Sequence, residues 1–289
     1  MISYSALTKI LRPRQWIKNL FVILPVLLLP AEMRAENFLG VLVGFLCFCT
    51  FASSIYILND FLDRQHDQYH PRKKLRPLAS GEVSVTSVFI LGAGILICGL
   101  IGAYSISIKF LLWGVTYLVL MSVYSLGLKH RPPMDVLIIA LGFVIRVEAG
   151  SSLLDVTPTT WLLTITFLLS LFLALAKRRD DIVQGLDTSH RPSLKGYNRL
   201  YLDISITVVL SAFLVCYILY TIDPVVIKFS GSDKLYLTVP IVILGVLRYL
   251  QILFVFNQPS DPENVLANDK MISCAIISWM IILGLILYY

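Results

Sequence analysis

Nine apolar stretches, each about long enough to cross the hydrocarbon core of a bilayer, constrain the fold of this chain most strongly. They lie at about residues 16–31, 37–58, 84–106, 108–128, 134–153, 158–176, 200–222, 235–256 and 270–288. Hydrophobic residues make up 57% of the 289, and the mean hydropathy of +0.80 exceeds that of a soluble domain. We therefore predict an all-α, polytopic membrane protein with one domain over residues 1–289. The first stretch is the weakest of the nine, because Pro25 and Pro30 interrupt it.

Lysine and arginine are distributed unevenly between the two sides of this topology. The N-terminus and the loops after the second, fourth, sixth and eighth stretches hold 18 of the 24, whereas the opposite side holds four. Positive residues favour the cytoplasmic side, so we expect a cytoplasmic N-terminus and an external C-terminus. The net charge of +6 follows mostly from this bias, and it requires no nucleic-acid partner.

Acidic residues gather where the second apolar stretch ends, in the sequence NDFLDRQHD. On a helix, Asp60, Asp63 and Asp67 fall within an arc of about 60°. Like charges at this spacing destabilise a helix unless a cation neutralises them. A set of ligands that are all oxygen atoms favours Mg²⁺, which commonly binds substrate phosphates at the same time. We therefore predict a metal site at these three residues. The alternative is a solvated helix end whose acids pair with the basic residues that follow.

Further polar residues are expected on the same cytoplasmic side. They precede the apolar core of the first stretch, flank the carboxylates, and lie in or beside the loops after the fourth and sixth stretches: Lys18; Asn59, Lys73, Lys74 and Arg76; Tyr124 and Lys129; Lys177, Arg178, Asp180 and Asp181. Two loops that each combine acids with bases indicate two phosphate-bearing partners. For any one of the lysines or arginines, topological anchoring is the alternative.

Charged residues within the spans need a separate explanation, because a charge near the middle of a bilayer usually faces a cavity. Arg146 and Glu148 lie in the fifth stretch and Arg248 in the eighth. One interpretation is a structural bond between Glu148 and Arg248. The other places Arg146 at the floor of a cavity, beneath a phosphate.

The five cysteines, Cys47, Cys49, Cys98, Cys216 and Cys274, all fall within apolar stretches. We expect them to be small buried hydrophobic residues without disulfides.

Several motifs resemble one known family. NDFLDRQHD is similar to the NDxxDxxxD signature of the UbiA superfamily of intramembrane prenyltransferases, whose fold has nine transmembrane helices around a cytoplasm-facing cavity. Six further segments resemble the decaprenyl-phosphate phosphoribosyltransferase branch of this superfamily. They are LRPRQWIKNLFV, KLRPLASG, YSLGLKH, FVIRVEAG, ALAKRRDD and VPIVILGVLRY, which begin at residues 11, 74, 124, 143, 174 and 239. The resemblance covers nearly the whole chain, and it implies a place in the bacterial inner (plasma) membrane.

The resemblance implies transfer of a 5-phosphoribosyl group from phosphoribosyl pyrophosphate (PRPP) to a polyprenyl (decaprenyl-type) phosphate, with Mg²⁺ at Asp60, Asp63 and Asp67. The donor phosphates would contact Lys73, Lys74 and Arg76. The lipid phosphate would contact Lys18, Lys129, Arg146, Lys177 and Arg178, and the substrate-binding set also includes Asn59, Tyr124, Asp180 and Asp181.

Two departures separate the chain from common prenyltransferases. The loop after the sixth stretch has Asp180, Asp181 and Asp187 but no DxxxD pair, and Tyr124 and Lys129 are five residues apart instead of four. Both departures suit the phosphoribosyl branch. The alternative function is a UbiA-type transfer of an isoprenoid from its diphosphate to an aromatic acceptor. A transporter is a weaker alternative, because its acids would line a transmembrane path instead of one face.

Overall fold

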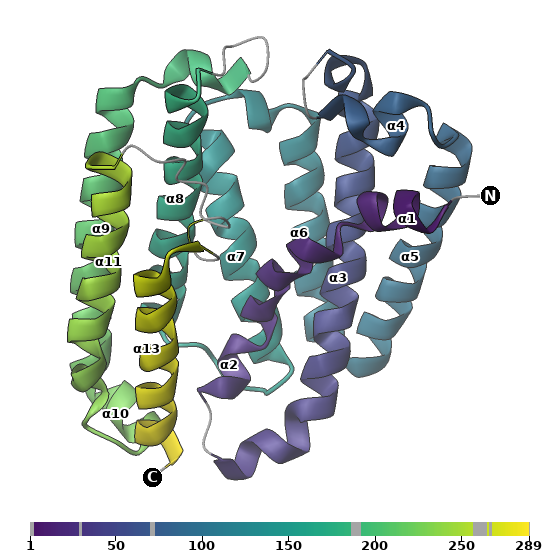
Figure 1. Ribbon diagram of the computed structural model, residues 1–289. Coiled ribbons are helices and arrows are strands. Elements are labelled where there is room, and N and C mark those ends of the chain that lie inside the picture. Colours follow the sequence, from purple (N-terminus) through teal and green to yellow (C-terminus); the bar gives the residue numbers. More distant parts are fainter. Residues whose placement is uncertain are drawn as a thin grey trace. The chain divides into compact units, whose positions relative to one another are not determined.

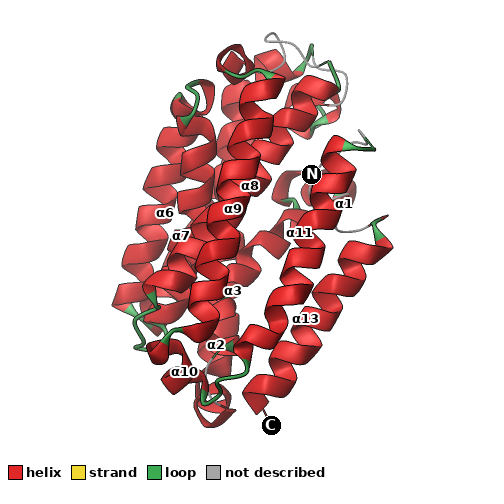
Figure 2. Cartoon of the chain, turned by 90° about the vertical axis from the view of Figure 1, so that its left-hand side faces the viewer, coloured by secondary structure: helices red, strands yellow, loops and turns green. Residues whose placement is uncertain are grey.

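The computed structural model describes residues 3–28, 31–69, 73–185, 192–256, 265 and 268–288, and every element in these ranges is helical (Figure 1 and Figure 2). An α-helix pairs its backbone N–H and C=O groups within its own segment, which is why an apolar chain crosses lipid in this form. The prediction of an all-α membrane protein is confirmed.

Seven described helical segments are long and apolar enough to cross a bilayer. They are α3 (Ala31–Asp67), α5 (Val85–Ile106), α6 (Ile108–Leu126), α8 (Thr160–Val183), α9 (Arg199–Ile222), the 3₁₀ turn η5 (Leu235–Thr238) with α11 (Val239–Phe254), and α13 (Lys270–Tyr288). Helix α7 (Met134–Ser152) covers the fifth predicted span but carries three charged residues, Asp135, Arg146 and Glu148.

The first expected span, residues 16–31, is not one continuous α-helix in its described part. After α1 (Tyr4–Leu11), residues Pro13–Val22 form the 3₁₀ helix η1, and Leu24–Leu27 form the short α2. Proline removes a backbone donor and fixes φ, so Pro13 and Pro25 favour new helix starts over one long helix. Nine spans are therefore not confirmed.

Serine side chains set two of the helix starts. Ser84 Oγ accepts a hydrogen bond from Ser87 N at 3.2 Å and begins α5, and Ser107 Oγ accepts from Phe110 N at 3.4 Å and begins α6. Before α5, the short α4 (Pro77–Ser80) ends at Gly81, whose φ of +76° suits glycine.

The chain divides into two compact units. Unit 1 comprises Met1–Leu27 and Ala35–Pro158, and unit 2 comprises Leu28–Arg34 and Thr159–Tyr289. In unit 1, η1 packs on α7, α6 packs on α5 and α7, and an aromatic core of Phe48, Phe51, Phe110 and Tyr117 is buried. In unit 2, α8 packs on α9 and α11 on α13. A single domain over residues 1–289 stays a prediction.

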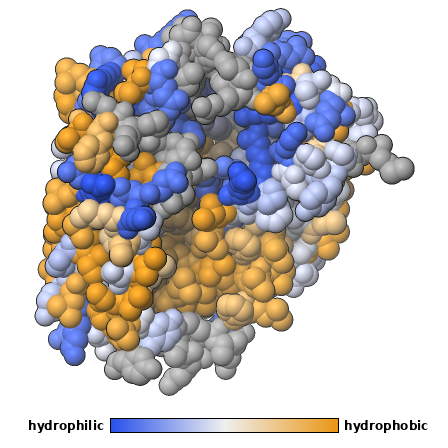
Figure 3. All heavy atoms as spheres, viewed as in Figure 1, coloured by the Kyte–Doolittle hydropathy of each residue, from blue (hydrophilic) through white to orange (hydrophobic). Residues whose placement is uncertain are grey.

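Apolar side chains also cover much of the outside, as Figure 3 shows for one face. On α5, for example, Ile90, Ile97 and Ile101 are exposed. Apolar surfaces of this kind can face lipid. The expectation that all five cysteines are buried is therefore wrong: Cys47 and Cys49 are buried, but Cys98 and Cys274 are exposed. All five cysteines are free, as expected.

Candidate functional site

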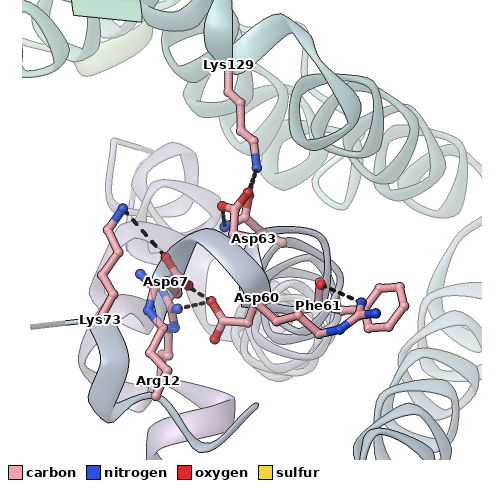
Figure 4. Close-up of polar contacts among 10 residues, drawn as sticks. Arg12, Asp60, Phe61, Asp63, Asp67, Lys73 and Lys129 are labelled. Atoms are coloured by element: carbon pink, nitrogen blue, oxygen red, sulfur yellow. Dashed lines mark hydrogen bonds and ion pairs between the residues drawn. The ribbon is translucent and has the colours of Figure 1, made fainter. Parts of the chain in front are cut away.

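The three predicted aspartates lie in the last two turns of α3 (Figure 4). Asp60 and Asp67 are buried, with relative exposures of 6% and 3%, and Asp63 is partly exposed. Buried carboxylates need compensating charge or hydrogen bonds, because they lose their hydration. Three cationic side chains of unit 1 supply that compensation to the two buried carboxylates, and a fourth pairs with Asp63.

Arginine nitrogens neutralise the two buried carboxylates. Arg76 Nη1 donates to Asp60 Oδ1 at 2.9 Å and to Asp67 Oδ2 at 2.7 Å. Arg12 Nη2 donates to the same oxygen of Asp60, and Lys73 Nζ lies 3.9 Å from Asp67 Oδ1. Asp60 and Asp67 are thus joined through one guanidinium nitrogen.

Both arginines are followed by a proline that begins a helix. Arg76 has the extended backbone expected of a residue before proline (φ −68°, ψ 139°) and precedes α4. Arg12 ends α1 in the left-handed conformation (φ 54°, ψ 57°), and Pro13 begins η1. These turns direct two side chains from different segments to the end of α3.

The third carboxylate has a separate partner. Lys129, in the short η3 (Leu128–His130), reaches across to α3 and donates to Asp63 Oδ1 at 2.5 Å and to Asn59 Oδ1 at 3.0 Å. Asn59 Nδ2 donates to Asp63 Oδ2 at 3.1 Å. The structure therefore brings Lys129 together with Asn59 and Asp63, from which it is far apart in the sequence.

We call Asp60, Asp63 and Asp67 with Arg12, Lys73, Arg76 and Lys129 the carboxylate cluster. It pairs three acids with four cations. Lys73 and Arg76 belong to the basic residues that follow the acids, as in the alternative that the sequence left open, but Arg12 and Lys129 come from other segments and two of the acids are buried instead of solvated. In the part of the chain that the structure describes, no three His, Cys, Asp or Glu residues form a metal-binding group. The oxygen-only donors fit Mg²⁺ chemically, and two buried carboxylates sharing one cationic nitrogen show a demand for positive charge there. The Mg²⁺ site stays a prediction.

Three other predicted residues of unit 1 lie outside the carboxylate cluster. Lys18 donates to Gln15 Oε1 at 2.5 Å, Lys74 is exposed in η2 (Lys73–Leu75), and Tyr124 lies near the end of α6. Their roles stay predictions.

Arg146 forms a different network, inside unit 1. Its Nε donates to Asn19 Oδ1 at 2.8 Å, its Nη1 to the carbonyl oxygen of Gly142 at 2.8 Å, and its Nη2 to Tyr117 Oη at 3.0 Å. Arg146, Asn19 and Tyr117 are all buried, and no described acid lies within ion-pair distance of the guanidinium. Arg146 therefore binds η1 to α6 and α7. No local pattern in the sequence pointed to Asn19 or Tyr117 as its partners.

The other intramembrane arginine, Arg248, has its acidic partner within unit 2. Arg248 Nη2 donates to Asp269 Oδ2 at 2.8 Å. The guanidinium lowers the pKa of Asp269, chiefly through this hydrogen bond. The interpretation of a bond between Arg248 and Glu148 stays a prediction.

The second charged loop also lies in unit 2, at the end of α8. Arg178, Arg179 and Asp180 are buried there and Lys177 is exposed. Arg179 Nε donates to Asp203 Oδ1 at 2.5 Å, and Arg179 Nη2 is buried without a hydrogen-bond partner among the described residues. Two further contacts stay within α8 and the turn that follows it: Gln184 donates to Asp180, and Arg178 lies 3.8 Å from Asp181. Asp187 lies outside the described residues.

The match to known families agrees with these features. Residues 19–273 match the UbiA prenyltransferase family. The chain belongs to this family. It is a UbiA-family transferase and an integral membrane protein with multiple apolar helices.

Relatives of this UbiA protein differ in how much of it they match. A decaprenyl-phosphate phosphoribosyltransferase of Mycolicibacterium smegmatis is 29% identical and spans 99% of this chain and 93% of its own. A 4-hydroxybenzoate octaprenyltransferase of Nitrosomonas europaea is 28% identical but spans 46% of this chain and 47% of its own. A UbiA homolog from Archaeoglobus fulgidus, solved bound to GPP and Mg²⁺, superposes with a TM-score of 0.70 at 18% identity, over 96% of this chain and 99% of that one. The fold is therefore UbiA-like.

Proposed function

We propose that this protein transfers a 5-phosphoribosyl group from PRPP to a polyprenyl phosphate and releases pyrophosphate. One observation carries the proposal: similarity to a decaprenyl-phosphate phosphoribosyltransferase extends over 99% of the chain, whereas similarity to an octaprenyltransferase stops at 46%. The absence of a DxxxD pair from the second charged loop supports the same donor.

The proposed reaction requires no general acid or base from the protein. An oxygen of the acceptor phosphate forms a bond to ribose C1, and the bond from C1 to the pyrophosphate oxygen breaks with its electron pair leaving on pyrophosphate. Both the nucleophile and the leaving group are anions, so no proton must move. The ribose carbon gains oxocarbenium character, as in other glycosyl transfers. The protein must therefore position two anions against each other and stabilise the charge on the leaving one.

The carboxylate cluster suits the leaving group. Asp60, Asp63 and Asp67 would hold Mg²⁺, which when bound neutralises charge on the departing pyrophosphate. Arg12 and Arg76 have donors left over after binding Asp60, and guanidinium groups match phosphate oxygens. Lys129 orients Asp63 and Asn59 through its two bonds.

Residues of unit 2 would serve the second anion. Arg179 Nη2 is a buried donor without a described partner, and Lys177 is exposed on the same helix end. In unit 1, Arg146 already has three neutral acceptors. We therefore assign Arg146 to holding η1 and leave the lipid phosphate to the other basic residues.

The test is a transfer assay on the purified protein in lipid nanodiscs with Mg²⁺, labelled PRPP and a polyprenyl phosphate. Labelled lipid is expected, and Asp63→Asn should remove it while Lys109→Ala, at an exposed ion pair with Asp155, should not. An absence of labelled lipid, together with prenylation of an aromatic acid from a prenyl diphosphate, would refute the proposal.

A further inference from the structure

A hollow of ≈310 Å³ lies in unit 1 between α1 and α4, beside the carboxylate cluster. Its lining residues are Lys9, Arg12, Leu75, Arg76 and Pro77. Three of these five carry a positive charge and none carries a negative one. The hollow therefore favours an anionic ligand.

The cations of the hollow keep donors for such a ligand. Among the contacts of the described residues, Arg12 uses only Nη2 and Arg76 only Nη1 of their side-chain nitrogens in hydrogen bonds. A guanidinium has five N–H groups, so most remain available. Lys9 Nζ lies 3.8 Å from Glu82 Oε2, but both side chains are exposed, by 51% and 38%, and an exposed pair of this kind is weak.

The shape and position of the hollow narrow the ligand further. Two guanidinium groups and one ammonium match the oxygens of a phosphate monoester, while Leu75 and Pro77 offer an apolar wall to the carbon atoms next to it. Arg12 and Arg76 also contact Asp60. A phosphate in the hollow would thus lie about one side chain away from a diphosphate at the carboxylate cluster.

We propose that the hollow binds the 5-phosphate of the phosphoribosyl donor while the carboxylate cluster holds its diphosphate, an inference that rests on the proposed function. A prenyl diphosphate carries no phosphate monoester apart from its diphosphate, so it gains nothing from Lys9. The hollow is therefore a determinant of donor selectivity. The phosphate of the lipid acceptor has the same chemistry as the 5-phosphate of the donor. The two ligands are distinguished by whether substitution in the hollow changes the KM for PRPP or the KM for the lipid.

The test compares the full chain in nanodiscs with three variants: Lys9→Ala, Lys9→Arg and, as a matched control, Lys109→Ala. Ribose 5-phosphate carries the 5-phosphate alone and pyrophosphate carries the diphosphate alone, so their inhibition constants against PRPP probe the two subsites separately. In Lys9→Ala, the KM for PRPP and the inhibition constant of ribose 5-phosphate should rise about tenfold, as expected for one lost charge-assisted hydrogen bond. The inhibition constant of pyrophosphate and the KM for the lipid should not change. Lys9→Arg and Lys109→Ala should behave like the wild type.

Two results would overturn this assignment. One is an equal change in the inhibition constants of ribose 5-phosphate and pyrophosphate in Lys9→Ala. The other is a rise in the KM of the lipid alone, which would assign the hollow to the lipid phosphate. Calorimetric binding of ribose 5-phosphate needs no turnover. If the protein transfers phosphoribosyl groups but does not bind ribose 5-phosphate, the assignment of the hollow is refuted. If it binds ribose 5-phosphate but makes no phosphoribosyl lipid, the proposed function is refuted.

Discussion

Replacing Asn19 by leucine removes the acceptor of a buried charged donor and tests whether Arg146 holds the N-terminal 3₁₀ helix in place. Asn19 Oδ1 accepts from Arg146 Nε at 2.8 Å, and Asn19 Nδ2 donates to Cys49 Sγ at 3.4 Å. Leucine has a similar size but no polar atoms. An unsatisfied buried donor costs about 1–3 kcal/mol, and a charged one lies at the upper end. We therefore expect a loss of about 2–3 kcal/mol in the free energy of unfolding.

Thermal unfolding of the purified protein in detergent measures this loss. For a chain of this length, 1 kcal/mol lowers Tm by about 2–4 °C, so Asn19→Leu should lower it by roughly 4–12 °C. The matched variant is Asn19→Asp, which has the same shape and places a carboxylate against the guanidinium. Its Tm should be at least that of the wild type.

Two outcomes would refute the reasoning. Unfolding of Asn19→Leu at the wild-type temperature would show that the bond to Arg146 contributes no stability. Equal destabilisation by leucine and aspartate would show that the site depends on the amide itself, because aspartate retains the acceptor that Arg146 needs.

Three other contacts are open to similar tests. A Cβ at Gly150 of α7 would collide with the carbonyl oxygen of Val22, so Gly150→Val should displace η1 and lower Tm, whereas Gly94→Val, with open space around the position, should lower it less. Lys129→Met should leave Asp63 and Asn59 without their shared cation and reduce kcat/KM for PRPP at least tenfold, with Lys109→Met as the control; unchanged kinetics would remove Lys129 from the site. The pKa of Asp269 is lowered in the folded state, so its contribution to stability is present above the unfolded value of about 3.9 and is lost as pH falls through the folded pKa. Tm measured from pH 3 to pH 7 should therefore separate the wild type from Asp269→Asn at neutral pH and bring them together at the acid end, and a constant difference would contradict the linkage.

Local sequence patterns predicted the features that depend on one segment. The apolar stretches indicated the spanning helices, and the spacing of NDFLDRQHD placed three aspartates at the end of α3. These outcomes depend on hydropathy and helical periodicity, which act over a few residues.

The features that the sequence did not predict depend on distant partners. Arg12 was counted as a topological charge, but it meets Asp60, 48 positions away, through a left-handed turn. Arg248 meets Asp269, which lies beyond the apolar stretch, 21 positions away. The exposure of Cys98 was also not predictable from the sequence, because lipid-facing and core-facing positions are equally apolar in a membrane helix.

Helix α3 is longer than a bilayer requires, and its length has a consequence for the membrane in which the protein works. Its 37 residues span about 55 Å, against a hydrocarbon core of about 30 Å. The apolar residues 37–58 alone match that core, so Asp60 begins less than one turn beyond it. A thicker bilayer would draw this turn into the acyl chains or force the helix to stand more upright, and a thinner one would increase its tilt. Acyl-chain length should therefore regulate this protein through the depth at which its carboxylates meet water.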